Sequence, residues 1–186
     1  MRILAIAGSL RRDSHNKQLL RRAAELLPEG VELDWFEQLR TIPPYDADDD
    51  TASAPAPVQA IRNSIAAADA LLIATPEYNA SIPGVLKNAL DWASRPFPDN
   101  ALRSKPVAVI GASTSMFGAV WAQAETRKVL GAIGARVVDA ELPVARAHEA
   151  FGEHDRLLEP DHHDGLTEIV DRLVEEARAR RLDVAA

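Results

Sequence analysis

The residue types best suited to chemistry lie in a short polar run near the N-terminus, residues 8–16 (GSLRRDSHN). The run follows the apolar segment 3–7 and precedes a helical pattern that starts near Lys17. Backbone N–H groups at a helix N-terminus, joined by hydroxyls and a guanidinium, favour a bound anion such as phosphate. The run therefore predicts an anion-binding loop, with donors from Ser9, Arg11, Ser14 and Asn16.

A simpler interpretation of the same run is an ordinary helix cap. A single Ser, Asp or Asn before a helix stabilises it by about 1 kcal/mol, but a cap needs only one such residue. A phosphate monoester carries a charge of roughly −1.5 to −2 and three acceptor oxygens, which match several donors. The run fits neither the G-x-x-x-x-G-K-[ST] loop of nucleoside triphosphatases nor the G-x-G-x-x-G fingerprint of nicotinamide-binding proteins. A monophosphate ligand is therefore favoured.

Two further polar loops follow other apolar runs, at residues 76–84 (PEYNASIPG) and 111–118 (GASTSMFG). Each is explained in part as a simple turn built from Pro, Gly and small residues. However, Tyr78 and Asn79 offer an aromatic wall and amide groups to a planar heterocycle, and Met116 and Phe117 offer cover for one edge of it. Together the three loops predict a phosphorylated planar cofactor.

The elements that position these loops follow from apolar periodicity. Short apolar runs predict five strands, at residues 2–7, 31–36, 70–74, 107–111 and 136–141. Nearly continuous apolar strands are typical of a parallel sheet covered on both faces. Helical spacing lies between the runs and after the last one, so strands and helices alternate. The pattern predicts a three-layer α/β/α sandwich with a five-stranded parallel sheet, for which the flavodoxin-like order 2-1-3-4-5 is one of two common forms.

Composition restricts the class of protein further. The chain has 186 residues, of which 47% are hydrophobic and 26% charged, and we expect a single domain over residues 1–186. A net charge of −7 without a basic stripe argues against a nucleic-acid partner. The chain has no cysteine, no signal-peptide pattern and no apolar stretch near the length of a membrane span. These features predict a cytoplasmic protein without a membrane partner.

The motif G-S-L-R-x-x-S-x-N at residues 8–16, followed by P-E-Y-N-x-S-x-P-G-x-L-K-N-A-x-D-W at residues 76–92, resembles the NADPH-dependent FMN reductase family. This family of flavodoxin-like proteins includes quinone, azo-dye and chromate reductases, and the resemblance extends from residue 3 to about residue 157. It implies non-covalent FMN, with the phosphate in the first loop and the isoalloxazine against the other two. The third loop is less rich in glycine than is common in the family. The implied cofactor contacts are Ser9, Leu10, Arg11, Ser14, Asn16, Pro76, Glu77, Tyr78, Asn79, Ser113, Met116, Phe117 and Gly118.

The resemblance also implies an activity. NADPH or NADH passes hydride to FMN and leaves, and a small acceptor such as a quinone, azo compound, chromate or free flavin then takes both electrons by a ping-pong mechanism. No side chain is predicted to be catalytic, because the chemistry belongs to the cofactor. Relatives of this kind are usually homodimers or homotetramers.

Two other functions stay open. A flavodoxin-type electron-transfer protein, without oxidation of pyridine nucleotides, has the same fold, although residues 9–16 do not resemble the flavodoxin loop Thr/Ser-x-Thr-Gly-x-Thr. A flavin-free phosphoacceptor or binding module needs paired acids after the first strand, and residues 7–9 supply none.

Three features outside the loops have plain interpretations. His162 and His163, between two aspartates, predict a solvated start of the last helix rather than a metal site. Trp92 fits either core packing or a subunit contact beside the flavin. Residues 142–164 lack clear periodicity, and we interpret them as a segment able to fold against a partner subunit.

Overall fold

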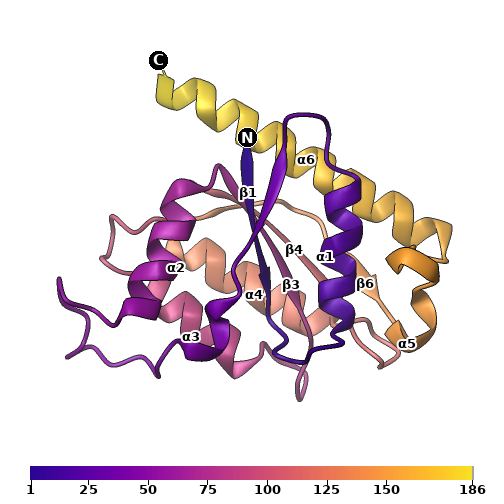
Figure 1. Ribbon diagram of the computed structural model, residues 1–186, viewed down its shortest axis with the longest axis horizontal. Coiled ribbons are helices and arrows are strands. Elements are labelled where there is room, and N and C mark those ends of the chain that lie inside the picture. The colour runs from indigo at the N-terminus through magenta and orange to yellow at the C-terminus, as the bar shows by residue number, and fades with distance from the viewer. Residues whose placement is uncertain (186) are drawn as a thin grey trace.

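A parallel sheet forms the centre of the structure, a computed structural model that describes residues 1–185 (Figure 1). The strand order is β2-β1-β3-β4-β5, and neighbouring strands pair in parallel. This is the predicted flavodoxin-like order. Its strands are β1 (Arg2–Ala7), β2 (Glu32–Trp35), β3 (Ala70–Thr75), β4 (Pro106–Ala112) and β5 (Arg136–Val137).

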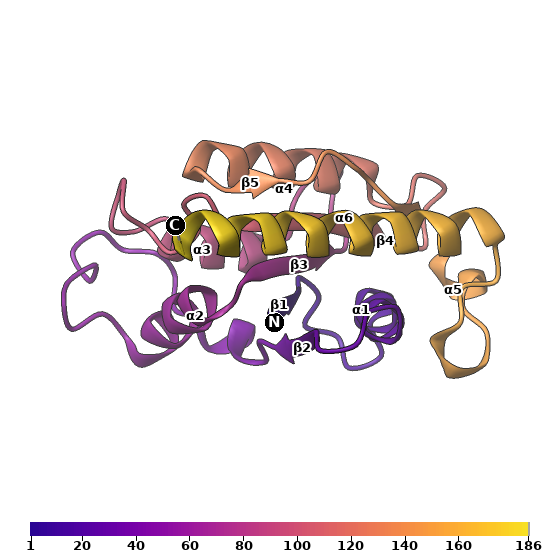
Figure 2. The same cartoon turned by 90° about the horizontal axis from the view of Figure 1, so that it is seen from above.

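Helices cover both faces of this sheet, as Figures 1 and 2 show. Leu19 of α1 and Ile169 of α6 pack with Ile3 and other strand residues in the core on one face. The core on the other face contains residues of α2, α3 and α4, among them Val58 and Leu90. The helices are α1 (His15–Glu25), α2 (Ala56–Ala67), α3 (Gly84–Ala93), α4 (Val120–Ile133), α5 (Ala147–Ala150) and α6 (Pro160–Ala185), with 3-10 turns η1 (Gln38–Thr41) and η2 (Glu153–Asp155).

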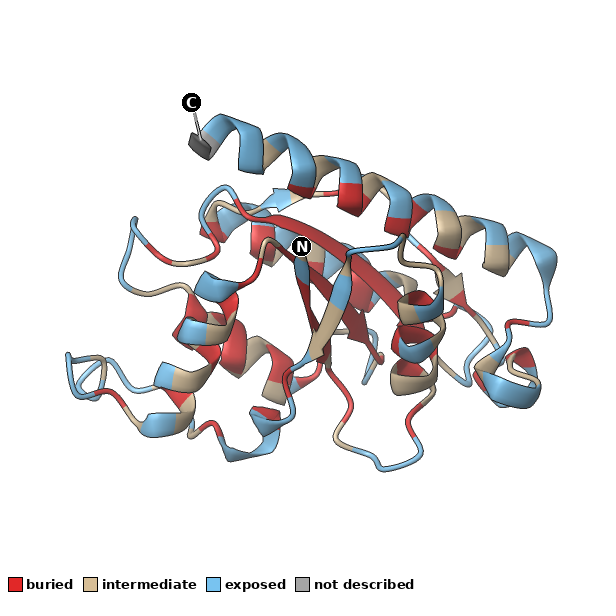
Figure 3. Cartoon of the chain, turned by 45° about the horizontal axis from the view of Figure 1, so that its top comes forward, coloured by how far each residue is buried: buried red, intermediate tan, exposed pale blue. Residues whose placement is uncertain are grey.

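Burial explains why the central strands are continuously apolar. Every residue of β3 and β4 is buried, whereas the edge strand β2 is partly exposed along its length (Figure 3). Side chains of a strand alternate between the two faces, so a strand covered on both sides has no solvated positions. Parallel strands also direct their C-terminal ends, and the three polar loops that follow β1, β3 and β4, to one edge of the sheet.

The fifth strand differs from the prediction of one strand over residues 136–141. Only Arg136–Val137 pairs as β5, and a sixth strand, β6 (Pro143–Val144), resumes the pairing with β4 at Gly111 and Ala112. Between them, Gln123 of α4 donates to the carbonyl of Leu142 at 3.2 Å and accepts from its N–H at 3.0 Å. The Leu142 carbonyl also accepts from the N–H of Gly111 in β4 at 3.3 Å, so Gln123 holds the chain at the point where pairing with β4 resumes.

Residues 142–164 also differ from their interpretation as a segment for a partner subunit. They form β6, α5, η2 and the start of α6, and Val144, Ala147, Ala150 and Leu157 are buried in the core that α1 and α6 share. Asp155 accepts hydrogen bonds from Gln18 and Arg21 of α1, at 2.9 and 2.5 Å. The segment therefore packs on its own chain. No helix in the described part of the chain has the length and apolarity that a membrane crossing requires.

Candidate functional site

The three polar loops meet at the C-terminal edge of the sheet and enclose a pocket of about 150 Å³. The first loop begins directly on the sheet, because the N–H of Gly8 donates to the carbonyl of Ala74 in β3 at 2.8 Å. A Cβ at position 8 would lie 3.1 Å from both Pro76 and Leu86, so any larger residue there would have to push these side chains aside. The lining residues are Ser9, Arg11, Ser14, His15, Asn16, Pro76, Glu77, Tyr78, Ala112, Ser113 and Thr114.

Ser14 carries the clearest sign of a missing partner in this pocket. It stands at the N-cap of α1, where its side chain makes no capping hydrogen bond. Its hydroxyl is buried and has no hydrogen-bond partner within residues 1–185. A buried polar group left unpaired costs about 1–3 kcal/mol, which a ligand oxygen can offset. The hydroxyl therefore fits a phosphate held at the positive end of the helix dipole.

Arg11 lies at the rim of the same loop. Its Nε donates to the backbone carbonyl of Asp13 at 2.9 Å, and its Nη2 donates to the same oxygen. The Ser9 hydroxyl accepts a hydrogen bond from the Arg11 N–H at 3.4 Å. The residue is exposed and its guanidinium has N–H groups that these two hydrogen bonds do not use, so a cation lines the same pocket as Ser14.

Asn16 joins two distant parts of the site. Its Nδ2 donates to the carbonyl of Ala112 at 2.9 Å, and its Oδ1 accepts from the Ala112 N–H at 3.0 Å. The side chain is buried. Because this pair uses the amide oxygen and one N–H, the side chain fastens the first loop to the end of β4 and keeps one N–H for a ligand. Sequence spacing offered no signal for a contact between residues so far apart.

The second loop is a tight hairpin that presents an aromatic ring. Tyr78 and Ser81 exchange backbone hydrogen bonds at 3.1 and 3.2 Å. Asn79 and Ala80 between them have φ angles of 53° and 57°, the left-handed pair of a type I′ turn. The ring of Tyr78 stands at the pocket edge and is about half exposed, at 53%. A planar ligand in the pocket therefore has an aromatic surface available.

Two carboxylates attach this hairpin to α4. Glu77 accepts from the N–H of Ala122 at 3.1 Å, in the first turn of that helix. Glu125 accepts from the Ser81 hydroxyl at 2.5 Å and from the Ile82 N–H at 3.1 Å. The hydrogen bond from Ser81, followed by the one from Ile82, holds the pKa of Glu125 below its usual value. Sequence reasoning missed Glu125, since no local motif includes it.

The third loop is ordered by its own hydroxyls. Ser113 Oγ accepts from the N–H of Ser115 at 3.2 Å and lies 3.1 Å from Ser115 Oγ. Gly118 has a φ of 58°, and a Cβ there would lie 2.3 Å from Pro143, so the position requires glycine. Met116 and Phe117 are exposed outside the pocket, where Phe117 packs edge-on against Trp121 at 4.8 Å. Trp121 is also exposed and was missed from the sequence.

The pocket thus brings together eight of the residues that the resemblance implied: Ser9, Arg11, Ser14, Asn16, Pro76, Glu77, Tyr78 and Ser113. The other implied contacts, Leu10, Asn79, Met116, Phe117 and Gly118, do not line it. Leu10 lines a neighbouring cavity instead. All of these contacts remain predictions until a ligand is measured.

The histidines of the pocket and of α6 have simple structural surroundings. His15 lines the pocket, lies 2.8 Å from Gln18 Oε1 through Nδ1 and stacks on Phe151 with ring centroids 6.0 Å apart. His162 and His163 lie in the first turn of α6, and no group of three or more His, Cys, Asp or Glu residues suited to a metal occurs among the described residues.

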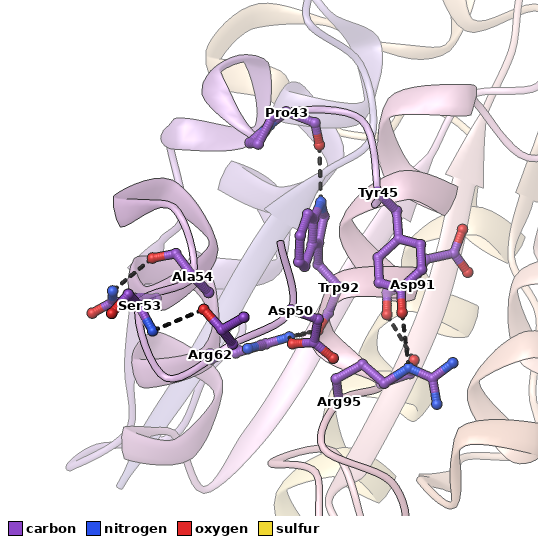
Figure 4. A network of polar contacts seen from close by, with 12 residues as sticks. Pro43, Tyr45, Asp50, Ser53, Ala54, Arg62, Asp91, Trp92 and Arg95 are labelled. Carbon is purple, nitrogen blue, oxygen red and sulfur yellow. Dashed lines mark hydrogen bonds and ion pairs between the residues drawn. The ribbon is translucent and has the colours of Figure 1, made fainter. Parts of the chain in front are cut away.

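Trp92 is fully buried, and its indole N–H donates to the carbonyl of Pro43 at 2.9 Å (Figure 4). Tyr45 meets the indole edge-on at 4.8 Å, and Arg62 donates to the Trp92 carbonyl at 2.9 and 3.0 Å. The network holds the chain between η1 and α2 against α3. Core packing, rather than a subunit contact, therefore accounts for Trp92.

Comparison with known proteins identifies the family. The family model described as NADPH-dependent FMN reductase matches residues 1–149. The chain belongs to this family. It is 41% identical over 160 residues to an NAD(P)H-dependent FMN reductase of Pseudomonas aeruginosa, covering 86% of this chain and 85% of that protein. It is 37% identical over 183 residues to a 2-hydroxy-1,4-benzoquinone reductase of a Burkholderia species, covering 98% and 99%.

A solved structure supports the same family. The flavoenzyme FerB of Paracoccus denitrificans, an NAD(P)H:(acceptor) oxidoreductase, superposes with a TM-score of 0.83 at 33% identity, over 96% of this chain and 97% of that one. The expected fold and the expected class, an NAD(P)H-dependent oxidoreductase of the FMN reductase family, are confirmed. Family membership also implies FMN as the cofactor and NAD(P)H as the reductant of this reductase.

Proposed function

We propose that this reductase uses bound FMN to transfer two electrons from NAD(P)H to small acceptors, with quinones as the favoured class. The observation that carries the proposal is the pocket where three loops meet, with the unpaired Ser14 hydroxyl and the Arg11 guanidinium on one side and the Tyr78 ring on the other. The proposal for quinones draws on the relatives named for quinone reduction.

Ser9, Arg11 and Ser14 would hold the FMN phosphate. A buried hydroxyl, an exposed guanidinium and the N-terminus of α1 supply donors of three kinds within one short loop. The net charge of −7 weakens binding of the phosphate only slightly, because charges beyond about 8 Å are screened at physiological salt. Charge-assisted hydrogen bonds contribute about 1.5–3 kcal/mol each, so the local donors dominate.

Pro76, Tyr78 and Ser113 would flank the ring, with Asn16 and Glu77 fixing the loops that carry them. FMN supplies the hydride acceptor and donor in this chemistry, and the protein contributes position and exclusion of water. We further propose that Leu10, Asn79, Met116, Phe117 and Gly118 approach the cofactor only at the edge of this pocket or after loop movement.

The wider acceptor range and the assembly are part of the proposal. An open pocket edge beside Tyr78 and Ser113 suits azo compounds, chromate and free flavin as well as quinones, in ping-pong order after the nucleotide has left. Met116, Phe117 and Trp121 form an exposed apolar cluster on the same side of the sheet, which supports a homodimer or homotetramer.

Anaerobic titration tests the function directly. The protein is reconstituted with FMN, NADPH or NADH is added without oxygen, and absorbance of the oxidised flavin is followed before and after addition of benzoquinone. We expect bleaching by the nucleotide and recovery with one equivalent of quinone. Bound FMN that does not bleach would favour the flavodoxin-type alternative, and failure to bind FMN would exclude both functions.

A further inference from the structure

A second cavity, of about 580 Å³, lies on the other side of the first loop. Its walls come from that loop, from α1 and from the chain that follows β2. Ser9 lines both this cavity and the flavin pocket, so the two spaces share one wall. The residues that matter here are Leu10, Lys17, Arg21, Trp35, Glu37 and Arg40.

The cavity is positively charged although the chain is acidic. Lys17 and Arg21 lie four residues apart on α1 and so share one side of the helix. Arg40 of η1 donates to the carbonyl of Leu10 at 3.3 Å, which holds it over the first loop. Glu37 is the carboxylate among the lining residues. Three cationic side chains and one carboxylate thus line the cavity.

Two of these cations are free to bind an anion. Arg21 is paired with Asp155 at 2.5 Å, which balances its charge. Lys17 and Arg40 take part in no ion pair with any residue that the structure describes. A guanidinium and an ammonium group that line one cavity from different elements are well suited to a phosphate.

An aromatic surface adjoins the cations. Trp35, the last residue of β2, is 38% exposed and lines the cavity. An exposed indole on an edge strand offers a flat face for stacking, and apolar side chains such as Leu10 line the same cavity. Cationic side chains and an exposed indole in one cavity match a ligand that carries a phosphate on a planar heterocycle.

We propose that this cavity binds the adenosine 2′-phosphate end of NADPH, with Lys17 and Arg40 on the phosphate and Trp35 against the purine. The proposal rests on the proposed function and specifies its reductant. The shared wall at Ser9 allows one nucleotide to place its nicotinamide at the flavin pocket and its adenosine in this cavity. NADH lacks the 2′-phosphate, so Lys17 and Arg40 do not increase its affinity.

Steady-state kinetics of the FMN-loaded enzyme with a quinone acceptor test this assignment. In the double variant Lys17→Ala/Arg40→Ala, we expect kcat/KM for NADPH to fall about 10- to 100-fold, as loss of charged hydrogen bonds implies, and that for NADH to change less than about 2-fold. Arg156→Ala, which removes an exposed cation elsewhere, is the matched control. Unchanged FMN affinity in the double variant shows that the flavin pocket is intact.

Calorimetry with adenosine 2′,5′-bisphosphate provides a readout apart from turnover. We expect this probe to bind the FMN-loaded enzyme, ADP to bind more weakly, and both Trp35→Ala and the double variant to lose affinity. Equal binding by the double variant and the wild type, or equal losses with NADPH and NADH, would overturn the proposal. So would saturation of the cavity by excess FMN in place of the bisphosphate. A wild type that oxidises neither nucleotide contradicts the proposed function itself, which separates the two failures.

Discussion

The two cavities beside the first loop are built in opposite ways. The pocket proposed for flavin relies on buried groups with fixed positions, such as the Ser14 hydroxyl and the Asn16 amide. The second cavity relies on long side chains, and its Arg40 and Trp35 are exposed at the surface. Buried, positioned donors lose little entropy on binding, whereas long exposed cations must be ordered and are screened by salt. If both assignments hold, buried groups of the fold retain the cofactor, and exposed side chains set the preference for one nucleotide.

The largest expected effect is the loss of FMN affinity when the proposed phosphate donors are removed. In the double variant Arg11→Ala/Ser14→Ala, loss of two charge-assisted hydrogen bonds is expected to weaken FMN binding by about 100- to 10,000-fold. Titration of flavin fluorescence measures this. The single variant Ser14→Ala should also make the FMN-free protein slightly more stable, since it removes a buried hydroxyl without a partner. Arg12→Ala is the control, because Arg12 lines neither cavity. Unchanged FMN affinity in the double variant would remove the phosphate assignment.

The second prediction tests whether the Asn16 side chain stabilises the first loop or binds the ligand. Asn16→Ala removes the two hydrogen bonds that the Asn16 side chain makes with the N–H and carbonyl of Ala112, and we expect the free energy of unfolding of the FMN-free protein to fall by about 2–4 kcal/mol. Urea denaturation measures this loss. Lys17→Ala, at the next position but facing the second cavity, should have no comparable effect. If Asn16→Ala weakens FMN binding without changing stability, the side chain acts on the ligand and not on the loop.

A smaller effect concerns the Tyr78 hairpin. The pKa of Glu125 is lowered in the folded state from its ordinary value of 4.5, so its stabilisation is complete above that value and is lost as pH falls through the folded pKa. Glu125→Gln should mimic acid conditions and raise KM for quinone by roughly 1.5- to 5-fold, as is usual for exposed pairs. A KM measured from pH 4 to 7 should then depend less on pH in the variant than in the wild type. Equal pH profiles would show that Glu125 does not hold the hairpin.

An effect of similar size is expected from the carboxylate of the second cavity. Glu37→Gln removes its carboxylate, and we expect the preference for NADPH over NADH to rise by about 1.5- to 5-fold. The ratio of kcat/KM for the two nucleotides measures this preference, with Glu29→Gln, an exposed acid outside the cavity, as the control. A decrease in preference would place the negative end of the nucleotide elsewhere.

Patterns of neighbouring residues predicted most of the fold. Apolar runs located β1, β3 and β4 to within a residue or two, and helical spacing located the crossovers, because burial of a strand or helix face depends on residues close in the chain. The fifth strand was predicted too long, because its pairing with β4 is split into β5 and β6, and Gln123 of α4 holds Leu142 between them. Residues 142–164 showed no period because they pack as short pieces into a core made by α1 and α6.

The sequence by itself determined the alternation of strands and helices and the positions of the three loops through local periodicity, and it indicated the family through a spaced motif that also favoured the observed strand order. Only the tertiary structure decided which of those residues share a pocket, that Asn16 holds Ala112, that Glu125 holds the Tyr78 hairpin, and that Lys17 and Arg40 face one cavity. The physical reason is that hydrogen bonds and cavities of this kind join elements far apart in the chain. Their partners are set by how helices pack on the sheet, which no local pattern records.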